Sequence, residues 1–195
     1  MKTSQTNHDS TKHKEIIISS ILNRKSIREY IPQKMVNKKD IYTLIRTGMA
    51  APSAGDRQPW AFIAITEREL LDKLANILPE AKFLNSAGGA IVVCGDMTKT
   101  LEGPGGDFWI QDCSAATQNI LLAAEAMELG AVWMGVYPNH FVGKENVIKL
   151  NRILNLPGTI VILNVIAIGY PQTREEAVDK YDETKIYPNK WSARS

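Results

Sequence analysis

The sequence has few cysteines, no long apolar run and almost no net charge. Among its 195 residues are two cysteines, Cys94 and Cys113, and the formal net charge is +2 at pH 7. Two isolated thiols favour buried, reduced cysteines over a disulfide or a metal cluster, which suits a reducing compartment. No run reaches the roughly 18 apolar residues that a transmembrane helix needs. The balanced charge does not indicate nucleic acid or a membrane surface as a partner. We therefore expect a cytoplasmic protein.

The chain also lacks the residue sets that define several enzyme classes. Its three histidines, His8, His13 and His140, show no metal-ligand spacing with the cysteines, so we expect no metal site. No Ser-His-Asp, Cys-His or paired-carboxylate set stands out. The glycine-rich loop EGPGGDFW, residues 102–109, has no Gly-Lys-Ser/Thr and no Gly-x-Gly-x-x-Gly after a strand, which argues against a Walker or Rossmann site. These absences suit an enzyme whose cofactor carries the chemistry better than a hydrolase.

Hydrophobic periodicity predicts helices interleaved with strands in a single α+β or mixed α/β domain. The expected helices cover residues 13–23, 38–50, 67–78, 109–129 and 143–154. The expected strands cover residues 61–66, 90–95, 131–137 and 159–168. Residues 1–12 are polar and are expected to form a flexible tail, which leaves one domain over 13–195. The polar end from about residue 171 carries Tyr187 and Trp191, so we expect it to wrap onto another surface.

A basic cluster, NRKSIREY, occupies residues 23–30. In an extended segment Arg24, Ser26 and Arg28 would share one face, because alternate residues point the same way. Two guanidinium groups and a hydroxyl on one face suit a phosphate group. The alternative is a solvated basic helix end, because cations are stabilised at a helix C-terminus.

A second unusual stretch, APSAGDRQPW at residues 51–60, is too polar and too broken for a strand, yet it ends on Trp60. Both stretches resemble motifs of the FMN-dependent nitroreductase family. RKSIREY is similar to the family's Arg-x-Ser-x-Arg opening, and APSAGDRQPW to its Pro-Ser-x-x-Asn-x-Gln-Pro-Trp loop. Three further stretches follow in the family's order: DCSAATQNILLAAEAMELGAVWMGVYP at 112–138, IGYP at 168–171 and YDETKIYPNKW at 181–191. The match covers about residues 15–191.

The resemblance implies a three-layer α/β/α fold with a central, mostly antiparallel sheet flanked by helices. It also implies an intertwined homodimer with two FMN sites at the subunit interface. The C-terminal arm, about residues 171–195, would wrap the partner. The loop at 51–60 would reach across to the flavin of the other subunit, with Trp60 anchoring its far end in the core.

The basic cluster is assigned to both ends of the FMN by the resemblance. Phosphate contacts fall to four residues: Arg24, Lys25, Ser26 and Lys180. Arg28 matches a cation near the pyrimidine end of the flavin, where it would stabilise the negative charge that reduction places at N1 and the C2 carbonyl. A surface ion pair with Glu29 or another nearby acid is the alternative for Arg28.

The remaining flavin contacts are assigned to a loop and a strand. The loop residues are Pro52, Ser53, Ala54, Gly55, Asp56 and Gln58, and the strand residues are Trp133, Met134, Gly135 and Val136. A backbone N–H around Gly135 should point at flavin N5, although WMGV is also typical of a buried strand. Asp56 stands where the family often has asparagine. A carboxylate cannot donate a hydrogen bond, which leaves Asp56 to cap its turn or to pair with Arg57. The glycine-rich loop at 102–109 is expected to be a mobile flap near the site, with Phe108 or Trp109 contributing to the substrate pocket.

The implied function is that of an NAD(P)H-dependent oxidoreductase. Hydride would pass from NADH or NADPH to FMN N5 and then, in a ping-pong cycle, to a nitroaromatic, quinone or similar conjugated acceptor. No side chain need act as an obligatory acid or base. Two alternatives stay open: a non-catalytic flavin carrier or redox sensor, and a superfamily member with different flavin chemistry, such as reductive dehalogenation or flavin fragmentation. The compact chain, without an obvious long insertion, favours the plain reductase.

Overall fold

The computed structural model describes residues 4–138, 142–174 and 176–191. Its helices are α1 (Ser4–Asn23), α2 (Lys38–Gly48), α3 (Arg68–Ile77), α4 (Phe108–Ala126) and α5 (Lys144–Ile153). Its strands are β1 (Trp60–Ile65), β2 (Gly89–Asp96), β3 (Gly130–Gly135) and β4 (Ile160–Gly169). Short 3-10 helices are η1 (Ala54–Asp56), η2 (Pro79–Asn85), η3 (Gly103–Gly105) and η4 (Glu183–Lys185). The expected helices and strands are all present, whereas the 3-10 helices were not anticipated.

The predicted start of the first helix was wrong. Helix α1 begins at Ser4, so residues 4–12, which were expected to belong to a flexible tail, continue the helix. The first 23 residues contain neither glycine nor proline, so no residue there breaks the helix. Residues 1–3 of the expected tail lie outside the described residues. The start of α2 was right: the Asn37 side chain caps that helix by accepting a hydrogen bond from the Lys39 N–H at 2.8 Å.

The four strands form one antiparallel sheet in the order β1-β2-β4-β3, which confirms the expected sheet. Strand β3 is therefore an edge strand. It pairs with β4 in a register that runs from Gly130 opposite Gly169 to Gly135 opposite Asn164. A register shift at Val93/Cys94 interrupts the pairing of β2 with β4.

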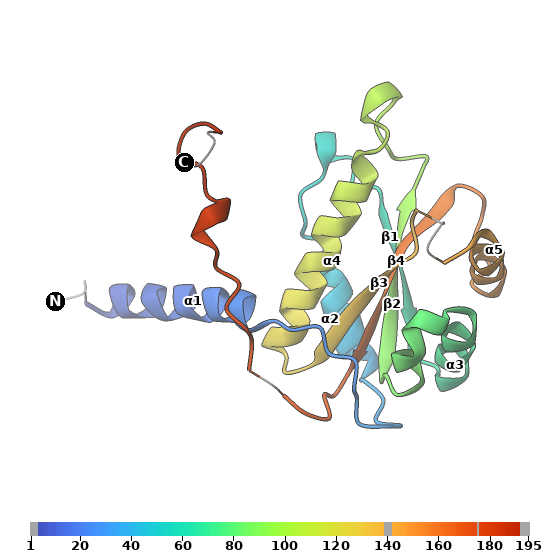
Figure 1. Ribbon diagram of the computed structural model, residues 1–195, viewed down its shortest axis with the longest axis horizontal. Coiled ribbons are helices and arrows are strands. Elements are labelled where there is room, and N and C mark those ends of the chain that lie inside the picture. The colour runs from blue at the N-terminus through green and yellow to red at the C-terminus, as the bar shows by residue number, and fades with distance from the viewer. Residues whose placement is uncertain (1–3, 139–141, 175, 192–195) are drawn as a thin grey trace.

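Helices cover both faces of the sheet (Figure 1). Helices α2 and α4 pack on one face, and α3 and α5 on the other. Along β2, Ile91 and Val93 point to the α2–α4 side, while Val92 and Cys94 point to the α3–α5 side. Burial on both faces explains why this strand is apolar without alternation.

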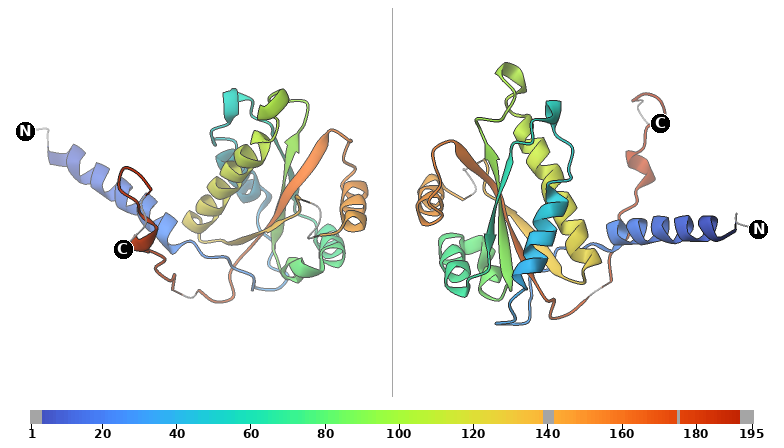
Figure 2. Two further views of the ribbon diagram at one scale, coloured as in Figure 1. Left: turned by 45° about the horizontal axis from the view of Figure 1, so that its top comes forward. Right: turned by 180° about the vertical axis from the view of Figure 1, so that it is seen from behind.

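Helix α1 and the C-terminal segment from residue 171 project from one side of the domain (Figures 1 and 2). Five apolar side chains of α1 are exposed: Ile16, Ile17, Ile18, Ile21 and Leu22. The C-terminal segment exposes four more: Val178, Tyr181, Ile186 and Trp191. The Tyr187 and Trp191 rings stack on each other with their centroids 3.9 Å apart. Residues 192–195 of the expected arm lie outside the described residues. None of the helices in the described part of the chain has the length and apolar character needed to cross a bilayer.

Candidate active site at the open edge of the sheet

The outer edge of β3 is largely open. Its short neighbour is the segment that follows α1: Ser26 pairs with Ala131, and the Ile27 N–H donates to Ala131 O at 3.1 Å. The backbone groups of successive strand residues point alternately to the two sides. Since Ala131 O faces outward, the N–H groups of Trp133 and Gly135 face outward too. The Val136 N–H confirms this alternation, because it donates inward to Leu163 O at 2.8 Å.

Within the described residues, no contact requires glycine at position 135. Among these residues, the nearest atom to a Cβ built there is Tyr137 O at 4.0 Å, and the φ of Gly135 lies outside the left-handed region. At Gly130, in contrast, a Cβ would lie 2.7 Å from Ile27 Cγ2. Packing therefore explains Gly130 but not Gly135. A flat ligand lying close to the backbone would explain it, because glycine allows such an approach.

A cavity of about 470 Å³ opens at the same end of β3. It is lined by Leu78, Pro79, Glu80, Met134, Gly135, Tyr137, Pro138 and Val142. Its volume lies within the range of small-molecule sites, and its lining is mostly apolar, as is usual for such sites. Among the described lining residues Glu80 is the charged one, and its side chain is exposed.

The basic segment is extended rather than helical. Helix α1 ends at Asn23, and residues 24–29 run alongside the start of β3. Ile27 packs inward at Gly130, so the alternate residues Arg24, Ser26 and Arg28 face away from the domain. Within the described residues, neither Arg24 nor Arg28 forms an ion pair or a side-chain hydrogen bond, so the alternative of an ion pair for Arg28 is not observed.

Two contacts hold the basic segment in place. The hydroxyl of Tyr30 donates to Ile27 O at 2.6 Å and lies 3.3 Å from Ala167 O on β4. Burial raises the pKa of Tyr30, an effect that the nearby Arg28 partly opposes, so this phenol stays protonated at neutral pH. The Lys25 ammonium donates to Glu176 O at 2.9 Å, which joins the segment to the start of the C-terminal arm.

The loop at 52–58 has an unusual backbone. Gly55, Asp56 and Gln58 have φ angles of 57°, 53° and 48°, in the left-handed region that residues with a Cβ rarely adopt. The Ser53 hydroxyl accepts from the Gln58 N–H at 2.9 Å, and Asp56 Oδ1 accepts from Gln58 Nε2 at 2.9 Å. Asp56 thus acts as an acceptor inside its own turn. The expected pairing with Arg57 is not among the described contacts.

One hydrogen bond joins the loop to α4: the Ala54 N–H donates to Asp112 Oδ1 at 2.9 Å. Asp112 is only 7% exposed. The loop also lies beside the glycine-rich loop, because a Cβ at Gly55 would be 3.3 Å from Leu101. Trp60, which follows the loop, is buried in the core as expected.

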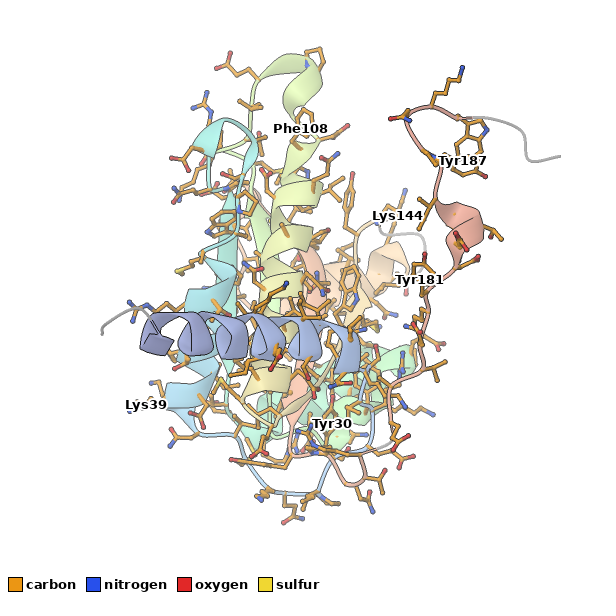
Figure 3. The ribbon with its side chains drawn as sticks, turned by 90° about the vertical axis from the view of Figure 1, so that its left-hand side faces the viewer. Tyr30, Lys39, Phe108, Lys144, Tyr181 and Tyr187 are labelled. Carbon is orange, nitrogen blue, oxygen red and sulfur yellow. The ribbon has the colours of Figure 1, made fainter. Side chains whose placement is uncertain are left out.

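The two aromatic residues expected in the substrate pocket lie in different environments. Trp109 is 4% exposed and packs in the core, where its ring meets Tyr137 edge to face at 5.0 Å. It therefore supports a wall of the cavity through Tyr137 and does not itself line the cavity. Phe108 is 43% exposed at the N-terminal end of α4 (Figure 3). Lys180 is exposed on the C-terminal arm.

One chain does not bring all the candidate residues together. Arg24, Lys25 and Ser26 lie next to β3, and Trp133, Met134, Gly135 and Val136 belong to β3 or follow it directly. No hydrogen bond within the described residues joins loop 52–58 to β3 or to residues 24–28. Phe108, beside this loop, and Tyr30, beside the basic segment, lie at opposite ends of the domain in Figure 3. The described contacts of one chain therefore do not join the loop to the basic segment or to β3.

The other titratable groups do not form a second catalytic set. Burial raises the pKa values of Cys94 and Cys113 to about 12, so both thiols are protonated and unreactive at neutral pH. In the described part of the chain, no three His, Cys, Asp or Glu residues gather as a metal site.

The sequence did not identify three residues that lie around the site: Glu80, Asp112 and Tyr137. Asp112 carried a signal, because it is an acidic residue outside the polar stripe of its helix, which runs through Gln111, Ser114 and Gln118. Glu80 had no comparable signal, since only the fold places the start of η2 beside β3.

Comparison with known proteins agrees with this geometry. Residues 21–86 and 78–170 match the model of the nitroreductase family. A protein of Archaeoglobus fulgidus named NADH dehydrogenase/NAD(P)H nitroreductase is 40% identical over 180 residues, which cover 91% of this chain and 99% of that protein. A crystal structure named NADH dehydrogenase/NAD(P)H nitroreductase from Parabacteroides distasonis is similar with a TM-score of 0.80 and 47% identity, covering 90% of this chain and 98% of that one. An FMN-dependent nitroreductase from Clostridium difficile gives a TM-score of 0.79 and 27% identity, covering 89% and 99%.

An antiparallel sheet with helices on both faces defines an α+β fold, and a cavity of small-molecule size opens at the free edge of that sheet. The chain belongs to the nitroreductase family and is an oxidoreductase of that family. Its fold is the nitroreductase fold.

Proposed function

We propose that this chain binds FMN along the open edge of β3 and transfers electrons from NADH or NADPH to a nitroaromatic, quinone or similar conjugated acceptor. The observation that carries the proposal is Gly135, a strand glycine that no contact with the described residues requires, at the mouth of an apolar cavity. The FMN-dependent nitroreductase of Clostridium difficile, which shares the fold, supports the choice of cofactor.

The residues present suit a flavin phosphate at one end of β3 and a flavin ring at the other. A phosphomonoester carries about two negative charges at neutral pH. Arg24 and Lys25 supply positive charge, and Ser26 supplies a hydroxyl beside Ala131. Gly135 lies further along the same strand, about 13 Å away at about 3.3 Å per residue. Lys180 on the arm would add a further cation.

The remaining roles concern the ring. The outward N–H groups of Trp133 and Gly135 would donate hydrogen bonds that fix its position, and the Gly135 N–H would lie at N5. Arg28 would place its fixed charge at the pyrimidine end and favour the reduced state. Bound FMN supplies the electron-accepting and electron-donating chemistry, so the chain needs no acid, base or nucleophile of its own. Solvent at this open edge can supply protons.

We further propose a homodimer in which loop 52–58 completes the flavin site of the second subunit. In the described part of one chain the loop forms no hydrogen bond with β3 or with residues 24–28, so we propose that it contributes to the site of a second copy. The exposed apolar side chains of α1 and of the arm offer a surface for that association, because exposed apolar patches mark interaction sites. The arm would wrap the second subunit.

Rapid mixing under anaerobic conditions tests the enzyme activity. NADH or NADPH should bleach the absorbance of the bound flavin, and a quinone added afterwards should restore it. The Arg24→Ala variant should retain less FMN after gel filtration. A flavin that neither nucleotide bleaches would make the protein a flavin carrier or redox sensor. Formation of a fragmented flavin under air would point to the alternative in which the protein is a flavin-fragmenting enzyme.

Mixed dimers test the shared site. One chain carries Arg24→Ala, and the other carries Gly55→Val, which cannot easily adopt the left-handed φ of 57° at that position. If each site takes Arg24 from one chain and the loop from the other, a mixed dimer has one intact site and binds one FMN. If each chain forms its own site, both sites of the mixed dimer are damaged and FMN binding stays as weak as in either parent.

A further inference from the structure

We infer that Asp112 is a positioning residue, which holds loop 52–58 in the conformation that contacts FMN. Its part in FMN binding rests on the proposed function. Its part as a tether of the loop rests on the structure alone.

Hydrogen bonds inside the loop cannot fix its position on the domain. Ser53 O accepts from the Asp56 N–H at 3.1 Å, Ala54 O from the Arg57 N–H at 3.2 Å, and the Ser53 hydroxyl from the Gln58 N–H at 2.9 Å. These bonds close the turn on itself. Among the described contacts, the bond that joins the loop to a helix is the one from the Ala54 N–H to Asp112 Oδ1 at 2.9 Å.

The shape of the loop makes such an anchor necessary. Asp56 and Gln58 both have a Cβ and both adopt left-handed φ angles, 53° and 48°. Backbone of this kind is unfavourable and persists only where surrounding contacts hold it. Without an anchor, the loop would be expected to relax toward ordinary turn conformations and to lose the shape that exposes its backbone to a ligand.

Asp112 is suited to be that anchor. It lies in the second turn of α4 and is 7% exposed. Its carboxyl group accepts the Ala54 N–H at 2.9 Å where little water can reach, so loss of this acceptor would leave the amide without a replacement partner. One turn before it, Trp109 packs against Tyr137, which lines the cavity. The first turns of α4 therefore position both the loop and a wall of the cavity.

Three variants of Asp112 distinguish the loss of its hydrogen bond to the loop from a general loss of protein stability. Asp112→Asn keeps an oxygen that can accept the Ala54 N–H, whereas Asp112→Leu and the smaller Asp112→Ala remove it. The matched control is Asn119 on the same helix, whose Nδ2 donates to Thr47 O on α2 at 3.2 Å and makes no contact with the loop. Asn119→Leu and Asn119→Ala thus remove a polar tether of α4 away from the site.

Two readouts are needed. Hydrogen exchange of the amides of residues 54–58 in the flavin-free protein measures the tether, and titration with FMN measures the consequence. In Asp112→Leu and Asp112→Ala we expect exchange of these amides to quicken at least tenfold and the Kd for FMN to rise at least fivefold. Asp112→Asn should stay within about twofold of the wild type in both, and the Asn119 variants should leave both unchanged even where they lower the Tm.

Unchanged loop exchange in both Asp112→Leu and Asp112→Ala would overturn the inference. So would an equal rise in the Kd for FMN in the Asn119 variants, since it would show a general loss of stability. If the wild type binds no FMN, the proposed function fails, while hydrogen exchange still decides whether Asp112 tethers the loop. The smaller Asp112→Ala variant keeps the test available if leucine does not fit in this buried position.

Discussion

Replacing Gly135 by a residue with a side chain should separate folding from flavin binding. The first methyl group at this position would lie no closer than 4.0 Å to any atom of the described residues, so Gly135→Ala adds no clash with them. Glycine within a strand costs about 0.5–1 kcal/mol relative to alanine. The flavin-free Gly135→Ala protein should therefore be as stable as the wild type or slightly more stable.

The same methyl group should oppose FMN. It would project from one face of β3, beside the edge where we place the flavin ring, and an extra methyl in a well-packed contact costs about 1–3 kcal/mol. This corresponds to a rise of about 5- to 150-fold in the Kd for FMN. The larger Gly135→Val variant should weaken binding further.

The assay combines thermal unfolding of the flavin-free protein with titration of FMN followed by flavin fluorescence. A gain of 1 kcal/mol would raise the Tm by about 2–4 °C in a chain of this size. Gly158→Ala is the matched control, because a Cβ at Gly158 also meets no atom within 4 Å, yet this residue lies in the turn before β4, outside the site. It should change neither the Tm nor the Kd appreciably. If Gly135→Val binds FMN as tightly as the wild type, the flavin does not lie against this strand and the assignment of Gly135 is refuted.

Three further predictions follow from other parts of the structure. Glu80 is the charged residue among the described residues that line the cavity, and its negative charge should repel an anionic substrate. Glu80→Gln should therefore raise kcat/KM for an anionic quinone relative to a neutral one by about two- to fivefold at low salt. High salt should remove the difference. Tyr30→Phe removes the donor to Ile27 O and should lower the free energy of unfolding by about 1–3 kcal/mol in a urea titration; an unchanged midpoint would contradict the role of this bond. Burial raises the pKa values of Cys94 and Cys113 from 9.0 to about 12, so above pH 9 the unfolded chain releases protons that the folded chain retains. Stability should therefore fall between pH 9 and 12 by up to about 1.4 kcal/mol per pH unit for each thiol, and a double cysteine-to-alanine variant should show a shallower fall.

Periodicity was sufficient to find the helices and strands, because each buries a regular apolar face. The run from Gly89 to Cys94 is apolar throughout, and β2 is covered by helices on both sides. The 3-10 helix η2 was missed because it is held by tertiary contacts: the Arg68 guanidinium donates to Leu84 O and Ala87 O at 2.8 Å. Such a contact has no local signature in the sequence. The helical start at Ser4 was missed because the first residues were predicted to be a flexible tail from their polar composition. Polar composition does not exclude a helix.

The site was predictable where a motif fixes a residue type and unpredictable where the fold joins distant segments. The basic segment carried its own pattern, and the structure places it beside β3 as an extended segment. The resemblance pointed to Gly135, and the empty space around its Cα supports that choice. The places of Asp112 and Glu80 in the site depend on the fold, because each lies beside a segment more than 50 residues away in the sequence. Trp109 was expected at the substrate and instead lies in the core, since its large apolar ring is buried against Tyr137.

The central claim is that this chain binds FMN, and the most direct test is the absorption spectrum of the purified protein, followed by identification of the chromophore that heating releases. The account predicts a yellow protein with flavin bands that releases FMN, close to one per chain. A colourless protein that takes up no added FMN would contradict the account, because the open edge of β3 would then have another ligand.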